Sequence, residues 1–90
     1  MALGKLDIQK THDAYTVIFE ENNGSSYAAG FDRTQLPDLL VERIRFGFTP
    51  EDVRLILNEL DKKGRVAVDN INVLENELTS AGLTNLPYEG

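Results

Sequence analysis

The chain has no cysteine and no tryptophan, and it has a single histidine among its 90 residues. Without cysteine it can form no disulfide, no thiolate zinc site and no cysteine nucleophile. A lone histidine, His12, has no second histidine to act with, and general base catalysis also needs a partner that orients the ring. Thiol chemistry is therefore excluded, and histidine-based catalysis is disfavoured.

Long apolar runs are also missing. The opening segment contains Lys5 and Asp7 within its first eight residues, where a signal peptide would carry an uninterrupted apolar stretch. A membrane-spanning helix needs about 20 consecutive apolar residues, and none is present. We therefore expect neither a secretion signal nor a membrane anchor, and we expect a cytoplasmic protein.

Basic residues are scarce. Nine lysines and arginines stand against 15 acidic residues, so the net charge is −6, and no segment of the chain is net basic. A phosphate backbone would be repelled by such a surface unless the bases gathered on one face. The charge balance therefore disfavours a nucleic-acid partner and favours a dispersed, soluble protein.

The residues that are present suit one folded domain. Apolar residues make up 41% of the chain and charged residues 27%, a composition close to that of ordinary globular domains. Ninety residues are enough for one hydrophobic core and too few for two. We predict a single domain over residues 1–90, with residues 1–3 and 84–90 loosely ordered.

Alternating apolar and polar side chains predict three strands at the N-terminus, over about residues 4–10, 14–21 and 25–32. Asn23-Gly24 separates the second run from the third, and both residues tolerate the positive φ that a tight hairpin requires. The pattern therefore indicates an antiparallel meander.

Two helices are predicted after the meander, over residues 35–46 and 50–63. The second has the better start and stop signals: Thr49 can cap it, Pro50 occupies its first position, and Gly64 can end it in a left-handed conformation. This helix is the most strongly specified element of the chain.

Residues 65–68 can be either an extended connector or a short fourth strand, and we favour the connector. A third helix is predicted over residues 69–81: Asp69, Asn70 or Asn72 can cap it, and Asn72 and Glu75 have the spacing of a capping box. Strands followed by helices predict an α+β fold in which three helices pack on a three-stranded antiparallel meander.

The loop after the second helix has the outline of a calcium-binding loop but lacks its ligands. With Gly64 at the sixth loop position, Lys63 falls at the fifth and Asn70 at the twelfth, where a bidentate glutamate is required. An ammonium group among the ligands opposes a cation. We expect no metal, no cofactor and no catalytic residue, and therefore a protein that is not an enzyme.

The region 50–81 also has the outline of a DNA-reading helix pair, and a three-stranded sheet can enter the major groove. The helix that would read the bases carries no lysine or arginine. A nucleic-acid interface gains support only if the basic residues near these helices converge on one face. Those residues are Arg43, Arg45, Lys62, Lys63 and Arg65.

Four apolar residues lie off the face that their element should bury. They are Ile18, Val41, Leu55 and Val73. Either they are covered by more than one neighbouring element, or they mark an interface, as clustered exposed apolar side chains do. We predict a small, soluble, non-enzymatic protein-interaction module that binds a protein partner or a second copy of itself. The alternative is a nucleic-acid-binding regulator that uses the helix pair 50–81 or the N-terminal sheet.

Overall fold

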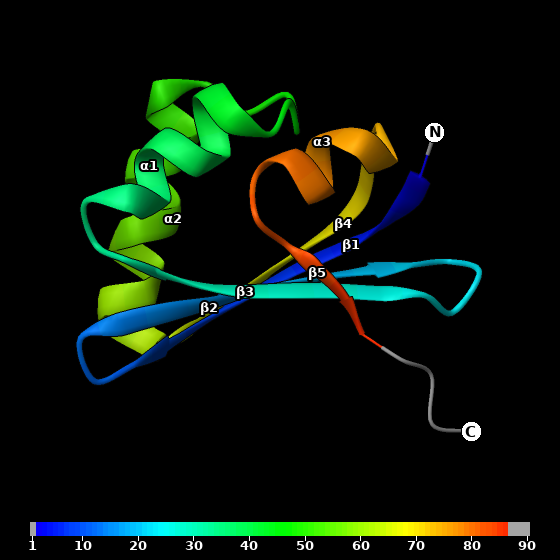
Figure 1. Ribbon diagram of the computed structural model, residues 1–90. Coiled ribbons are helices and arrows are strands. Elements are labelled where there is room, and N and C mark those ends of the chain that lie inside the picture. The colour runs from blue at the N-terminus through cyan, green and yellow to red at the C-terminus, as the bar shows by residue number, and fades with distance from the viewer. Residues whose placement is uncertain (1, 87–90) are drawn as a thin grey trace.

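An antiparallel sheet of five strands forms the centre of the computed structural model, which describes residues 2–86 (Figure 1). The order across the sheet is β4-β1-β2-β3-β5. The strands are β1 (Ala2–Thr11), β2 (Ala14–Glu21), β3 (Ser26–Asp32), β4 (Arg65–Val73) and β5 (Thr84–Leu86).

The helices lie on one side of this sheet (Figure 1). They are α1 (Gln35–Asp38), the π-helical turn η1 (Leu39–Arg43), α2 (Pro50–Lys63) and α3 (Glu75–Ser80). The predicted α+β class and the antiparallel N-terminal meander are confirmed, but the sheet has five strands instead of three. No helix within residues 2–86 is long and apolar enough to cross a membrane.

The meander β1–β2–β3 follows from local turn chemistry. His12 takes φ 39° in the turn between β1 and β2, and Gly24 takes φ 101° in the turn between β2 and β3. The Asn23 side chain accepts a hydrogen bond from the Ser25 amide at 2.9 Å, which closes the second turn. Both turns lie where the polar and glycine residues of the sequence place them.

Helix α2 begins and ends where the sequence predicts. The Thr49 hydroxyl accepts a hydrogen bond from the Asp52 amide at 3.1 Å, while the Asp52 carboxylate accepts one from the Thr49 amide at 2.9 Å. Gly64 ends the helix with φ 77°. These contacts satisfy two amides of the first turn, which have no partner inside the helix.

The first predicted helix is shorter than expected. It ends at Arg43 instead of 46, and Ile44 is already extended. The Ile44 amide donates to the Leu39 carbonyl five residues earlier, which is the wide turn of a π-helix. The start is capped by the Asp32 carboxylate, which accepts hydrogen bonds from the amides of Thr34 and Gln35. The Thr34 side chain, immediately before the helix, makes no capping hydrogen bond.

The prediction for residues 65–81 needs correction. Residues 65–68 are the start of the nine-residue strand β4, and the last helix covers only Glu75–Ser80. Asn70 takes φ 59° where the β1–β4 register shifts, so it forms a bulge inside a strand and does not precede a helix. Part of the tail that we expected to be loose forms β5, and residues 87–90 lie outside the described part.

The core lies between the sheet and the helices. On β1 and β2 it takes alternate residues, and the register places Leu6 opposite Phe19 and Ile8 opposite Val17. The helices add the buried leucines and isoleucines of their inner sides. The largest fully buried side chains are Tyr15, Phe19, Leu6, Ile8, Leu36, Leu39, Leu40, Ile44, Leu60, Leu78, Leu83 and Val17.

Candidate functional site

The structure separates the four predicted interface residues. Leu55 lies on α2 with 54% of its surface exposed. Ile18 is half-buried and opposite Asp7, on the sheet face that the helices leave open. Val41 is half-buried against the core. Val73 is only 1% exposed, because it belongs to a strand and, like Ile71 two residues earlier, faces the core. Leu55 is therefore the most exposed apolar candidate.

One edge of the sheet is bare over most of its length. Lys10 donates its amide hydrogen to the Gly64 carbonyl at 2.8 Å. Because hydrogen-bonded pairs alternate along an antiparallel ladder, Val66 and Val68 turn their amides toward β1. The intervening residues of β4, Arg65, Ala67 and Asp69, turn theirs outward, and no strand among residues 2–86 pairs with that side.

The opposite edge is largely closed. Glu21 donates its amide to the Ser25 carbonyl at 2.8 Å, so the same alternation turns the amides of Ser26 and Ala28 toward β5. Beyond the end of β5, the Asp32 amide donates to the side-chain oxygen of Gln35 at 3.0 Å. The strand at this edge is therefore β5, whose three residues turn only the backbone of Asn85 outward. Among the described residues of β3, the backbone of Gly30 is also left without a cover of this kind.

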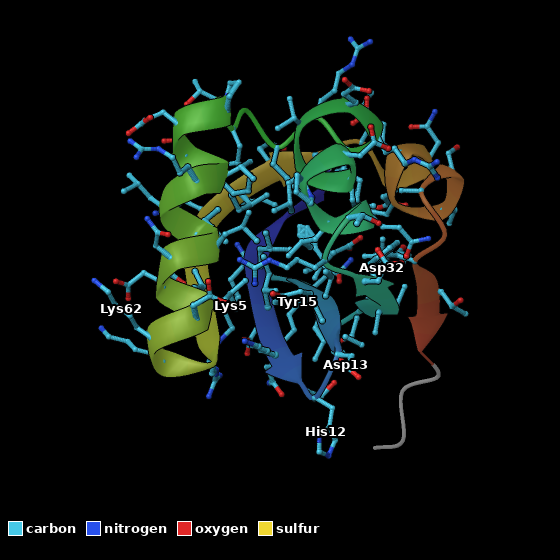
Figure 2. The ribbon with its side chains drawn as sticks, turned by 90° about the vertical axis from the view of Figure 1, so that its left-hand side faces the viewer. Lys5, His12, Asp13, Tyr15, Asp32 and Lys62 are labelled. Atoms are coloured by element: carbon cyan, nitrogen blue, oxygen red, sulfur yellow. The ribbon has the colours of Figure 1, made fainter. Side chains whose placement is uncertain are left out.

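Helix α2 lies over β1 and β4, next to the bare edge. Its Asp61 carboxylate reaches Lys10 and Arg33, so that flank of the helix faces the inside of the sheet. Successive helix residues are about 100° apart. Relative to Asp61, Asp52 and Glu59 therefore lie on about the opposite flank, facing past β4, and Leu55 and Lys62 lie between that flank and the solvent side of the helix. The stripe formed by these residues is Asp52, Leu55, Glu59 and Lys62. Figure 2 shows the Lys62 side chain extending from α2 away from the rest of the sheet.

Arg65, at the start of the bare edge, is held by Asp7 of the neighbouring strand. Its Nε and Nη2 atoms lie 3.1 and 2.7 Å from the two carboxylate oxygens. Asp7 raises the pKa of the Arg65 guanidinium through these hydrogen bonds. The Arg65 side chain remains 65% exposed. The two bonds to Asp7 fix the orientation of the guanidinium at the edge, and its Nη1 atom makes no bond to Asp7.

We call this region the β4 edge surface. It consists of the outward residues of β4 and the outer stripe of α2: Arg65, Ala67, Asp69, Asp52, Leu55, Glu59 and Lys62. All but Asp52 and Glu59, which are half-buried, are exposed.

A second group of polar side chains gathers at the other flank of α2. Arg33 makes two hydrogen bonds to Asp61, at 2.9 and 3.0 Å, and a third to the Tyr15 hydroxyl at 2.9 Å. Lys10 is 3.3 Å from the same carboxylate. Hydrogen bonds from Arg33 lower the pKa of Asp61 to about 2. Asp61 is therefore an ion-paired anion at neutral pH. This state suits a structural ion pair between α2 and the sheet better than a proton-transfer group.

Glu21 is a buried acid that the sequence pattern did not single out. It is 7% exposed, lies opposite Gly4, and its Oε1 atom has no hydrogen-bond partner among the described residues. Burial raises the pKa of the nearby Tyr27 hydroxyl, and the charges of Glu21 and Glu75 raise it further. No group of three or more potential metal ligands occurs in the described region.

The five basic residues that would support a nucleic-acid interface do not form one group: Lys62, Lys63 and Arg65 lie together at the end of α2 and the start of β4, whereas Arg43 and Arg45 belong to η1 and the segment after it. Arg43 is 3.1 Å from Asp38 on η1 and α1, whereas Lys63 is 3.3 Å from Glu59 at the end of α2. Arg65 faces Asp7. Several of these charges are therefore balanced locally by carboxylates, on separate elements.

Comparison of the chain with protein-family models, with curated protein sequences and with solved structures finds no match.

Proposed function

We propose that this chain is a non-enzymatic protein-interaction module whose β4 edge surface binds another protein chain. The observation that carries the proposal is a nine-residue edge strand with outward amides at Arg65, Ala67 and Asp69, flanked by the exposed Leu55. Backbone groups on an edge strand form the hydrogen bonds of an added strand, and apolar neighbours supply buried area.

The polar clusters give less support to an enzyme. In the cluster at the inner flank of α2, Asp61 binds both Lys10 and Arg33. The Asp61 carboxylate has a pKa of about 2, so it is too weak a base to suit proton transfer. The geometry of this cluster links three elements of the fold, which is a structural role. The dispersed, locally paired basic residues likewise give little support to a nucleic-acid-binding regulator.

Site-specific photocrosslinking in the source cell tests the proposal. A photoreactive amino acid at position 55 should form a covalent adduct with a protein, because Leu55 projects from the β4 edge surface. The same amino acid at position 76 is the control, since Asn76 is exposed on α3, beyond the end of β4 and outside the β4 edge surface. Adducts at position 55 and not at 76 support the proposal. Adducts at neither position, or at both equally, overturn it.

A further inference from the structure

We propose that the partner is a second copy of this chain, and that the two β4 strands pair antiparallel about a twofold axis at Ala67. This inference rests on the proposed function and names its partner. The two five-stranded sheets would then join into one continuous sheet with all helices on the same side.

The sequence of β4 is self-complementary in this register. Centred on Ala67, an antiparallel copy places Arg65 opposite Asp69 and Val66 opposite Val68, and it places Ala67 opposite itself. Residues that face each other across an antiparallel pair share a sheet face. Arg65 and Asp69 therefore meet on the open face, with two such ion pairs by symmetry, while the valines meet on the helix-covered face.

Neighbouring symmetric registers lose this match. Centring the pair on Val66 puts Arg65 opposite Ala67, and centring it on Val68 puts Ala67 opposite Asp69, so in both cases the charges are unmatched. A shift that pairs odd with even positions would put the helices of the two copies on opposite faces. Only the register about Ala67 pairs both charges and both valines.

The backbone groups point the right way for this register. Ala67 turns its amide and carbonyl outward, as derived from the Lys10–Gly64 hydrogen bond. The two Ala67 residues would exchange a pair of hydrogen bonds. Arg65 and Asp69 also turn outward, so the opposed charged residues can continue the ladder on either side of the axis until the bulge at Asn70.

The helices of the two copies have the right spacing. Each α2 lies over β1 and β4, so two copies of α2 would be about two strand spacings apart, which is about 9.6 Å. Packed helices are about 8–10 Å apart. The two α2 helices would therefore meet side by side without a clash or a gap.

The outer stripes of α2 also complement each other. Ala67 is three residues past Gly64, which is about 10 Å along a strand, and α2 covers that distance in about seven residues. The axis is therefore level with about residue 57. An antiparallel copy about that level brings Asp52 near Lys62 and Leu55 near the aliphatic part of Glu59, so the exposed leucine becomes covered.

The test compares two substitutions at the axis. Ala67→Pro removes the outward amide but no bond to β1, and proline is tolerated on an edge strand for this reason. Ala67→Thr keeps the amide and suits a strand, so it is the matched control. Light scattering over a range of concentrations should give twice the 10.1 kDa chain mass for the wild type and Ala67→Thr, and the single mass for Ala67→Pro.

A charge substitution tests the register. Asp69→Lys opposes two like charges across the axis and should raise the dissociation constant by about tenfold, with a larger effect at low salt. Circular dichroism must show that each variant keeps its secondary structure. Asp69→Lys is exposed and leaves the Arg65–Asp7 pair intact, so it reports on the register even if Ala67→Pro does not fold.

Two outcomes overturn the inference. A wild type that stays at 10.1 kDa up to millimolar concentration rules out the second copy as partner. A dimer that persists unchanged in a folded Ala67→Pro variant and in Asp69→Lys rules out the β4 pairing. In either case crosslinks from position 55 to a different protein would leave the proposed function standing, so the two failures are distinguishable.

Discussion

The two edges of the sheet are built differently. At the β3 edge, β5 covers Ser26 and Ala28, and the Gln35 side chain takes the amide of Asp32. At the β4 edge, the outward amides of three residues have no such cover in the described part of the chain. Proteins usually shield an edge strand because its free backbone groups recruit other strands. The edge opposite β4 ends in the three-residue strand β5, whereas β4 has nine residues, so β4 offers the longer row of backbone groups to an added strand.

The largest expected effect comes from Gly4 of β1, which lies opposite Ile71 of β4 and close to the backbone of β2. A Cβ atom at this position would overlap the backbone carbonyl of Glu20, beside the β1–β4 bulge. Gly4→Ala should therefore lower the free energy of unfolding by about 3 kcal/mol, measured by urea denaturation.

Gly30→Ala, on the β3 side, is the matched control. Its Cβ would meet nothing closer than the Tyr15 carbonyl oxygen at 4.0 Å. We expect a change within about 0.5 kcal/mol. Equal losses in the two variants would contradict the overlap with the Glu20 backbone as the cause of the loss at Gly4.

An intermediate effect should follow from opening the closed edge. Thr84 lies opposite Ala28, and the hydrogen-bond alternation turns its amide toward β3. Thr84→Pro should cost about 1–3 kcal/mol of unfolding free energy and should make the β3 edge prone to concentration-dependent association. Ala67→Pro, studied as a monomer, should cost less than about 1 kcal/mol. A larger loss for Ala67→Pro would show that its amide faces β1 after all.

The smallest effect concerns pH. Arg33 lowers the pKa of Asp61 from 3.8 to about 2, so the pair stabilises the native state above the ordinary carboxyl pKa. That contribution is lost as the pH falls from about 4 toward 2. The Asp61→Asn variant should be less stable than the wild type at neutral pH, and the difference should shrink over this window.

The effect should be modest, because the pair is exposed to solvent. Urea denaturation across this pH range measures it, with Asp13→Asn in the β1–β2 turn as the control. A difference that stays constant down to pH 2 would contradict the assigned role of the Arg33–Asp61 pair. Since this pair holds the inner flank of α2, it also tests what keeps the helix beside the β4 edge.

The candidate site was only partly predictable. Leu55 stood out because α2 was correctly predicted, so an apolar residue off its buried stripe was recognisable as a surface residue. Val73 was singled out because a helix was predicted there: in a helix it would lie off the buried stripe, but in β4 it shares the core face with Ile71 and is buried. The outward residues Arg65, Ala67 and Asp69 carry no sequence signal until β4 is known to be an edge.

The sequence by itself determined the elements whose signals are local. The cap at Thr49, the stop at Gly64 and the turn at Asn23-Gly24 act within a few residues, so α2 and the meander could be predicted. The tertiary structure alone decided that residues 65–73 and 84–86 are strands. Their ladder hydrogen bonds come from β1 and β3, more than 50 residues away in the chain, and such pairing leaves little trace in a short segment. The same long-range pairing made β4 the edge of the sheet.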